Sequence, residues 1–349
     1  MKILVTGNMG YIGPCVFDRL RGSYPDATLI GLDVGFFAHC LTGVEMLPEA
    51  RIDLQYYTDM RKISPEMLKD VYGIVHLAGV SNDPMGNEFE QVTTDINHLA
   101  SINLAKMAKE AGVKKYVFAS SCSVYGFAEG GARKESDELN PLTAYARSKI
   151  NTEKDIEELA SDDFVITCLR FATACGMSER LRLDLVLNDF VAGAVVSNEI
   201  TILSDGTPWR PLIHVEDMAR AIDWGISRKA ENGGAFLSLN AGSDEWNYQV
   251  KDLAEAVAEV MPGVNISINK DAQPDKRSYQ VDFGLYKKLA PDYQPQVDLI
   301  GAITGLKNGL EAMKFNNPDF RNSTYMRLKV LNGLREKGLI NDRLEWLPQ

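Results

Sequence analysis

The chain has 349 residues, of which 45% are hydrophobic and 24% are charged, and this globular composition permits one large domain or two smaller ones. Its formal net charge of −11 disfavours general binding to nucleic acid or an anionic membrane, because the long-range field repels polyanions. No apolar run approaches the roughly 20 residues of a membrane-spanning helix, and the 5 scattered cysteines without a CxxC pair argue against a disulfide framework or a zinc site.

Short apolar runs alternate with amphipathic stretches through the first half of the chain. Strands are predicted at KILVTG, TLIGLD, GIVHLAG, KKYVFASS and FVITCLR, with helical stretches between them. This alternation predicts an α/β fold of the Rossmann type, a doubly wound parallel sheet with helices on both faces. We place this domain at residues 1–176, with parts of about 211–241 returning to it.

The pattern changes after Gly176, where mixed polar and apolar segments predict a smaller C-terminal lobe at 177–319. Residues 320–349 form a C-terminal helical tail, whose segment MRLKVLNGLREKGLI predicts one amphipathic helix that packs on the body or on a second subunit. At the other end, MKILVTG runs directly into the first strand and leaves no room for a leader peptide, so we expect a cytoplasmic protein.

A GxxGxxG spacing follows the first strand, with glycines at Gly7, Gly10 and Gly13. Glycines at a strand-to-helix turn let the backbone approach a pyrophosphate, and the helix N-terminus offers free N–H groups. Ordinary turns also use glycine, so the motif by itself is a weak signal.

Asp33 ends the second strand, 20 residues after Gly13, where a carboxylate can accept hydrogen bonds from the adenosine ribose. It would repel a 2′-phosphate, and Val34 and Gly35 supply no cation, so the sequence favours NAD over NADP. The alternative is a solvated turn residue. Asp59, expected where the third strand ends, can contact the adenine or simply form a turn.

Two further features point to catalysis. Tyr145 and Lys149 form a YxxxK motif on a predicted helix, and residues four apart share a helix face. The ammonium is expected to lower the pKa of the tyrosine from about 10 toward neutrality. Ser121 lies in SSCSVYG at 120–126, directly after the strand KYVFA, and ligands of a parallel sheet collect at the carboxyl ends of its strands.

In this order, the glycine turn, the serine segment and the YxxxK motif resemble the extended short-chain dehydrogenase/reductases, particularly the NAD-dependent nucleotide-sugar epimerase/dehydratase family. The resemblance runs from Met1 to about Asp282 and includes HLAG at 76–79, LRFATACG at 169–176, DGTPWRPLIHVEDMARA at 205–221 and DKRSYQVD at 275–282. It implies NAD as cofactor and a nucleotide-diphosphate sugar as substrate. It also implies a homodimer, paired through the two long helices expected at about 90–111 and 143–160.

The resemblance further implies roles for single residues. Tyr145 is the general base or acid, Lys149 assists it and binds the nicotinamide ribose, and Ser121 hydrogen-bonds the sugar oxygen. Other cofactor contacts are expected at Gly7, Met9, Gly10, Tyr11, Ile12, Asp33, Asp59, Leu77 and Ala78. Substrate contacts are expected at Ser81, Asn82, Cys122, Ser123, Asn188, Arg210 and Arg277, with the last three on the diphosphate. Each arginine alone would more often be a solvated surface cation.

All reactions of this type begin when the phenolate removes a proton from a sugar hydroxyl as hydride leaves the same carbon for NAD. The 4,6-dehydratases of the family carry Asp and Glu in the two places after the catalytic serine or threonine. Cys122 and Ser123 stand there in this chain, so water elimination is disfavoured.

A 4-epimerase needs no further acid or base, so the sequence favours an NAD-dependent epimerase that acts at C4 through a keto sugar. A dehydrogenase or a 4-keto reductase is the alternative, and a 4,6-dehydratase or a non-catalytic dinucleotide sensor ranks below both. Cys122 can be an acid/base or a small core residue. Asp83 is expected to cap a helix or to form a turn, and His76 and His214 are expected in the core.

Overall fold

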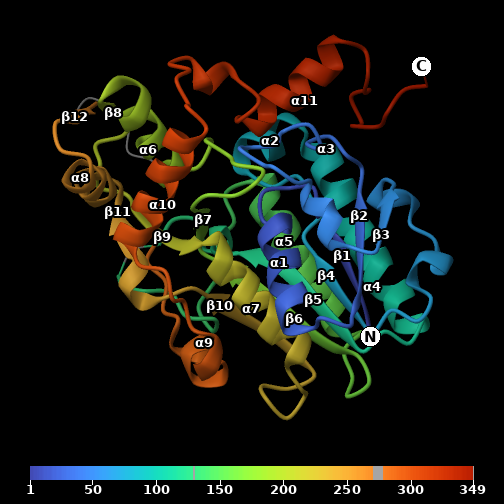
Figure 1. The fold of residues 1–349 in the computed structure, drawn as a ribbon. Coiled ribbons are helices and arrows are strands. Elements are labelled where there is room, and N and C mark those ends of the chain that lie inside the picture. The colour runs from blue at the N-terminus through green and yellow to red at the C-terminus, as the bar shows by residue number, and fades with distance from the viewer. Residues whose placement is uncertain (129, 270–277, 349) are drawn as a thin grey trace.

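The structure is a computed structural model that describes residues 1–128, 130–269 and 278–348. Its centre is a seven-stranded sheet with the order β10-β6-β5-β4-β1-β2-β3, in which every neighbouring pair is parallel (Figure 1). The predicted doubly wound α/β fold is therefore confirmed. The strands of this sheet are β1 (Lys2–Thr6), β2 (Thr28–Asp33), β3 (Leu54–Tyr57), β4 (Gly73–His76), β5 (Lys115–Ser121), β6 (Val165–Phe171) and β10 (Phe236–Ala241).

Two small sheets, β11-β9-β7 and β12-β8, lie outside the central one. Their strands are β7 (Thr173–Cys175), β8 (Glu199–Ile202), β9 (Trp209–His214), β11 (Asn247–Gln249) and β12 (Asn265–Ile268). The α-helices are α1 (Gly13–Ser23), α2 (Asp83–Glu88), α3 (Glu90–Thr93), α4 (Ser101–Glu110), α5 (Ala144–Glu157), α6 (Val186–Ser197), α7 (Val215–Ser227), α8 (Val250–Val260), α9 (Gly284–Leu289), α10 (Leu299–Ala312) and α11 (Arg327–Glu336).

Helices cover both faces of the central sheet, and the strands are correspondingly apolar on both faces. Within β1, Ile3 and Val5 join the core that contains Phe17 of α1 and Trp224 of α7. Leu4, between them, joins the opposite core with residues of α4 and α5. Successive side chains of a strand point to opposite faces, so a doubly covered strand reads as a continuous apolar run.

The helix expected at 90–111 is one helical segment with an irregular centre. α3 leads into a π-helical stretch, Thr94–Ala100, which continues as α4. Within it, the buried Asn97 accepts a hydrogen bond from the Val80 N–H at 2.7 Å and donates one to the Val80 carbonyl at 2.8 Å. The π-helical stretch thereby holds the loop that leaves the carboxyl end of β4.

The second lobe is built around α6, α8 and α10, whose apolar faces meet in one core that includes Phe190, Leu253 and Ile303. α7 packs against α1 on the central sheet, and β10 pairs in parallel with β6. The chain thus returns to the first sheet before it enters the second lobe again. Among the described residues, every helix is too short or too polar to span a membrane.

The C-terminal tail packs on the body of the molecule. Its helix α11 is shorter than predicted and ends at Glu336, and the chain then forms a turn closed by an antiparallel bridge between Ile340 and Trp346. Leu331, Ile340 and Leu344 share a core with Phe36 and with residues of α2 and α3. Figure 1 shows this red segment over α2 and α3.

The close packing of α7 on the sheet predicts opposite effects at two helical glycines. A Cβ added to Gly225 would lie 2.8 Å from Cγ2 of Val117 in β5, whereas one added to Gly305, exposed on α10, would meet nothing within 4 Å. We expect Gly225→Ala to lower the free energy of unfolding by about 1–3 kcal/mol through overpacking. Gly305→Ala should raise it by about 0.5–1 kcal/mol. Urea midpoints measure both, and equal shifts would contradict this account of the packing.

Candidate active site

The glycine turn joins β1 to α1 with no space for side chains. Gly7 has φ +72°, and a Cβ there would lie 2.6 Å from the backbone nitrogen of Ala78, after β4. A Cβ on Gly13 would lie 1.9 Å from the carbonyl oxygen of Asn8. Glycine is thus required at Gly7 by conformation and at both positions by contact. The turn therefore lies against the pocket with little side-chain volume and leads into the N-terminus of α1, the kind of place where a pyrophosphate binds.

Asp33, at the end of β2, organises this turn. Its Oδ2 accepts a hydrogen bond from the Met9 N–H at 2.9 Å, and its Oδ1 accepts one from the Gly35 N–H at 2.8 Å. Burial raises the pKa of the carboxyl group, and these two hydrogen bonds oppose that rise. Each oxygen keeps a second lone pair that a ribose hydroxyl can reach.

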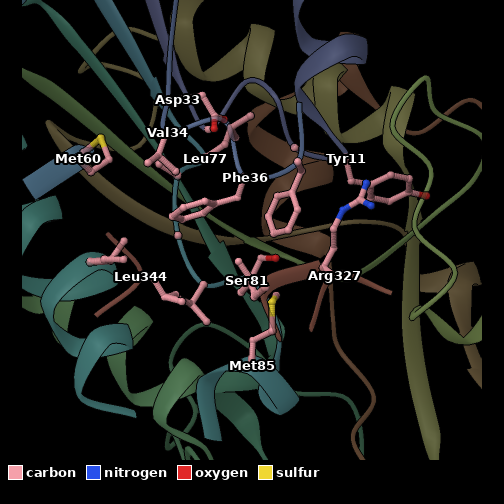
Figure 2. Close-up of a pocket in the computed structure, with 18 of the residues that line it drawn as sticks. Tyr11, Asp33, Val34, Phe36, Met60, Leu77, Ser81, Met85, Arg327 and Leu344 are labelled. Carbon is pink, nitrogen blue, oxygen red and sulfur yellow. The ribbon is translucent and has the colours of Figure 1, made fainter. Parts of the chain in front are cut away.

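A pocket opens between the turn, the end of β2 and the loop after β4 (Figure 2). Most of the predicted cofactor contacts line it: Gly7, Gly10, Tyr11, Ile12, Asp33, Asp59, Leu77 and Ala78. Met9 does not line it and is only 3% exposed, so its part is the backbone hydrogen bond to Asp33. Ser81, predicted for the substrate, also lines this pocket.

Asp59 forms the turn considered for it and also lines the pocket. β3 ends at Tyr57, two residues earlier than expected, and Asp59 then caps a short 3₁₀ helix by accepting a hydrogen bond from the Arg61 N–H. Its carboxylate also pairs with the Arg61 guanidinium at 2.5 Å. Asp59 is therefore a turn former that faces the pocket.

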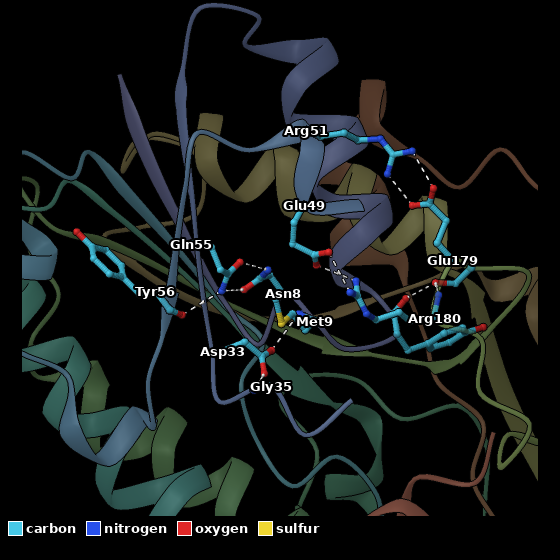
Figure 3. A network of polar contacts seen from close by, with 12 residues as sticks. Asn8, Met9, Asp33, Gly35, Glu49, Arg51, Gln55, Tyr56, Glu179 and Arg180 are labelled. Atoms are coloured by element: carbon cyan, nitrogen blue, oxygen red, sulfur yellow. Dashed lines mark hydrogen bonds and ion pairs between the residues drawn. The ribbon is translucent and has the colours of Figure 1, made fainter. Parts of the chain in front are cut away.

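Polar contacts link the glycine turn to β3, and the segment before β3 to residues 179–180 in the second half of the chain (Figure 3). Asn8 donates to the Gln55 side chain at 2.8 Å. Glu49 pairs with Arg180 at 2.8 Å, and Arg51 pairs with Glu179 at 2.6 Å. These two ion pairs neutralise Arg180 and Arg51.

Ser121, Tyr145 and Lys149 come together, as their spacing predicts. Ser121 ends β5 and lies near enough to Tyr145 to lower its pKa, and Tyr145 lies in the first turn of α5 after the N-cap Thr143. Lys149 lies one turn further along α5. Its Nζ donates to the Ala119 carbonyl at 2.7 Å and lies 5.6 Å from the centroid of the Tyr145 ring.

The pKa of Tyr145 differs from the expected shift toward neutrality. Burial raises this pKa to about 12, and the opposing effects of Ser121 and Arg182 are smaller. Burial also lowers the pKa of Lys149 to about 8. Both shifts have one cause, because removal from water disfavours the charged form of either group.

The loop after β4 carries a helix cap one residue earlier than predicted. Asn82, and not Asp83, caps α2, because its Oδ1 accepts a hydrogen bond from the Met85 N–H at 2.9 Å. The Asn82 amide also donates to Asp184 at 3.0 Å. Asp83 is the first residue of α2 and accepts a hydrogen bond from Thr143 at 2.7 Å. Both side chains therefore help to join α2 to its neighbours.

Cys122 belongs to the core beneath the site. It is 1% exposed, burial raises the pKa of its thiol, and Sγ donates to the Arg170 carbonyl at 3.0 Å. This arrangement favours the core role over acid/base duty and directs the thiol away from a sugar. Ser123 differs, since its buried hydroxyl has no hydrogen-bond partner within the described part of the chain.

Of the three residues predicted for the diphosphate, the structure describes Asn188 and Arg210, and their surroundings differ. Asn188 is fully buried, and its amide donates to the Tyr11 hydroxyl at 2.9 Å and to the Arg182 carbonyl at 2.8 Å. Both amide hydrogens are thus used within the protein. Arg210 is half-buried on β9 and donates to the Trp209 carbonyl. Arg277 lies outside the described residues.

Arg182 was not singled out from the sequence, yet it links the pocket to Tyr145. It lines the pocket, donates to the Ser81 hydroxyl at 3.1 Å and pairs with Asp184 at 2.8 Å. Its charge lowers the pKa of Tyr145. The sequence offered one signal for Arg182, namely its position between two leucines, Leu181 and Leu183. Both leucines are fully buried in the structure.

The histidines expected in the core are used there. His76 is buried between the hydroxyl groups of Thr6 and Ser101, each at 2.7 Å from a ring nitrogen, and burial lowers its pKa to about 3. His214 caps α7 by accepting a hydrogen bond from the Glu216 N–H. Neither ring faces the pocket.

Comparison with known proteins gives one family. The sequence profile of the NAD dependent epimerase/dehydratase family matches residues 3–242. A putative UDP-glucose 4-epimerase of Methanocaldococcus jannaschii is 26% identical and aligns with 90% of this chain and 99% of its own. UDP-glucuronic acid decarboxylase 1 of Arabidopsis thaliana is 25% identical over 97% of this chain and 73% of its own.

Among solved structures, MoeE5 in complex with UDP-glucose and NAD superposes with a TM-score of 0.74 at 24% identity, covering 89% of this chain and 99% of that one. This likeness supports the fold. The profile match confirms the family that the motifs indicate, and its relatives catalyse more than one reaction.

The buried ammonium of Lys149 predicts a pH-dependent contribution to stability. Its pKa is about 8 in the folded protein, compared with the usual lysine value of 10.5, which applies to the unfolded chain. Between pH 8 and pH 10.5 the unfolded chain therefore binds more protons than the folded protein. The free energy of unfolding should therefore rise with pH from 8 to 10.5, by on the order of 2 kcal/mol, relative to Lys149→Met. Urea unfolding of both proteins at pH 7 and pH 10 isolates this effect, and a constant difference would contradict it.

Proposed function

The chain belongs to the NAD-dependent epimerase/dehydratase family, and from this premise we propose that it epimerises a nucleotide-linked sugar at C4 through a transient keto sugar. The observation that carries the proposal is the grouping of Ser121, Tyr145 and Lys149, in which Lys149 Nζ lies 5.6 Å from the Tyr145 ring centroid and Ser121 lowers the pKa of Tyr145. Arg182 joins this group to the pocket that contains the glycine turn and Asp33.

NAD fits the pocket in shape and in polarity. The turn at Gly7 and Gly10 presents a backbone that a pyrophosphate can approach, and the Asp33 carboxylate suits a ribose diol. Asp33 also disfavours a 2′-phosphate. When bound, NAD supplies the acceptor and donor of hydride for the sugar carbon.

In the proposed mechanism, side chains of the protein carry out the proton transfer. Tyr145 removes it from the C4 hydroxyl as that carbon is oxidised, and returns it to the same oxygen when the carbon is reduced on its other face. Ser121 holds that oxygen through its hydroxyl. Burial keeps the phenol of Tyr145 protonated, so the nearby cations Lys149 and Arg182 are needed to stabilise the phenolate.

The substrate is proposed to be a nucleotide-diphosphate sugar. Arg210 and Arg277 are its predicted diphosphate ligands, and Ser81, Asn82 and Ser123 its predicted sugar contacts. Ser123 is the best supported of the three, because its buried hydroxyl has no partner among the described residues and so keeps its hydrogen-bonding capacity. We also propose a homodimer that pairs through the helical segments 90–111 and 143–160, where Leu99 is 53% exposed.

Epimerisation is favoured over elimination because no carboxylate follows Ser121. Cys122 is buried with its thiol on a backbone carbonyl, and Ser123 is not an acid. A dehydrogenase or 4-keto reductase that releases its products would use the same Ser121, Tyr145 and Lys149. That alternative is separated from the epimerase by the fate of the hydride.

Tyr145→Phe removes the group that exchanges the hydroxyl proton, so we expect turnover to fall by roughly 10²-fold or more. The dissociation constant for NAD should change little. Tyr72→Phe is the matched control, because Tyr72 lies just before β4, at the opposite end of the strand from the site, and should keep normal turnover. Near-normal turnover of Tyr145→Phe would contradict the mechanism.

A nucleotide sugar with deuterium at C4 tests the reaction type. UDP-, GDP-, CDP- and dTDP-hexoses are first surveyed for turnover, and the active one is then labelled. An epimerase should return the deuterium to the sugar product without added cofactor, because hydride leaves and re-enters at one carbon. Mass spectrometry of the product and of free NADH measures this. Deuterium on released NADH would instead identify a dehydrogenase.

A further inference from the structure

The C-terminal segment forms one wall of the dinucleotide pocket. Arg327, Leu331 and Leu344 line that pocket together with Gly7 and Asp33 (Figure 2). This wall comes from residues beyond the 3–242 region that matches the family profile. It is therefore a part of the site that the motifs of the first domain do not describe.

Contacts on both sides hold this segment in place. The Trp346 indole donates to the Val34 carbonyl at 2.7 Å, directly after Asp33, and its ring lies 5.3 Å from that of Phe36. The Arg61 guanidinium donates to the carbonyls of Arg343 and Leu344 at 2.8 and 3.1 Å. The segment is thus fastened to the end of β2 and to the turn after β3, where an adenosine would be bound.

Arg327, the first residue of α11, is the charged group of this wall. It is 1% exposed, and its guanidinium lies 5.1 Å from the centre of the Phe37 ring. It donates to three neutral carbonyl groups, those of Thr324 at 2.9 Å, Arg180 at 2.8 Å and Leu181 at 3.2 Å. Its Nε is buried and has no hydrogen-bond partner within the ranges that the structure describes.

Arg327 forms no ion pair with a described carboxylate, although Asp184, which pairs with Arg182, opposes the fall of its pKa. Its neighbours Arg180 and Arg182 each form an ion pair, with Glu49 and with Asp184, but no described carboxylate lies within 4.0 Å of Arg327. Burial and the two neighbouring arginines lower its pKa to about 10. A buried cation without an anion is costly, so the site is poised to receive negative charge.

Arg327 and the glycine turn meet the same short segment, 180–182. Arg327 donates to the carbonyls of Arg180 and Leu181. On the other side, Asn188 bridges the Arg182 carbonyl to the hydroxyl of Tyr11, which follows Gly10. Arg327 and the glycine turn are therefore two walls of one pocket.

We propose that Arg327 binds the pyrophosphate of the dinucleotide, opposite the N–H groups of the glycine turn. The proposal rests on the proposed NAD dependence of this chain. A guanidinium matches the spacing of phosphate oxygens, and a diphosphate supplies the anion that the pocket lacks. The diphosphate of the substrate fits Arg327 less well. The sugar would react at Tyr145, and the arginine that lowers the pKa of Tyr145 is Arg182, not Arg327.

Arg327→Met tests the proposal through binding alone. We expect the dissociation constants of NAD and ADP-ribose to rise roughly 10- to 100-fold, the effect of losing charge-assisted hydrogen bonds. The constant for adenosine, which has no phosphate, should change less than about 3-fold, and Arg327→Lys should recover part of the loss. Arg335→Met is the control, since Arg335 lies on the same helix but pairs with Glu88 and Asp342 at the surface.

A measurement on the unaltered protein keeps the test decisive if Arg327→Met does not fold. The ¹⁵Nε–H resonance of Arg327, assigned from the spectrum of Arg327→Lys, should shift with ADP-ribose and stay unchanged with adenosine. Unchanged NAD affinity in Arg327→Met, or no shift with ADP-ribose, overturns this role of Arg327. Weaker binding of UDP with unchanged NAD affinity also overturns it and assigns Arg327 to the substrate. Failure of the unaltered protein to bind NAD would instead overturn the proposed function.

Discussion

The structure depends on one crowded turn, where β1 passes into α1 without room for a single added carbon. Gly7 touches the backbone after β4, and Gly13 touches the carbonyl of Asn8. Asp33 then accepts a hydrogen bond from the Met9 N–H of this turn. The carboxyl ends of β1, β2 and β4 are thereby held together, and this edge of the sheet is where the pocket opens. Any side chain at these glycines would separate the strands that form its floor.

Positively charged side chains surround that edge of the sheet, although the protein as a whole is negatively charged. The chain carries a net charge of −11, yet Arg182 and Arg327 line the pocket and Arg180 lies beside them. Two of the three are neutralised by carboxylates, and Arg327 is not. Local cations in a low-dielectric pocket outweigh a distant, screened net charge, so an acidic protein can still bind a dinucleotide and a phosphorylated sugar.

Desolvation governs the catalytic pair as well. It moves the pKa of Tyr145 up to about 12 and the pKa of Lys149 down to about 8, so removal from water works against the charged form of each group. The helix spacing of YxxxK brings the two side chains together but does not by itself make the phenol acidic. The charges that face Tyr145 from other segments, Arg182 and Asp83, adjust it in opposite directions.

The sequence by itself determined the features that depend on local spacing: the strand and helix order, the glycine turn with Asp33, and the group of Ser121, Tyr145 and Lys149. Helix and strand periodicity fix such placements within a few residues. Only the tertiary structure decided that Cys122 faces the core and that the Asn188 amide donates to Tyr11 and Arg182. It also decided that Arg327 donates to the carbonyl of a residue 147 positions earlier. These contacts arise where segments far apart in the sequence pack together. The spacing of residues along the chain does not encode which buried polar groups will be partners.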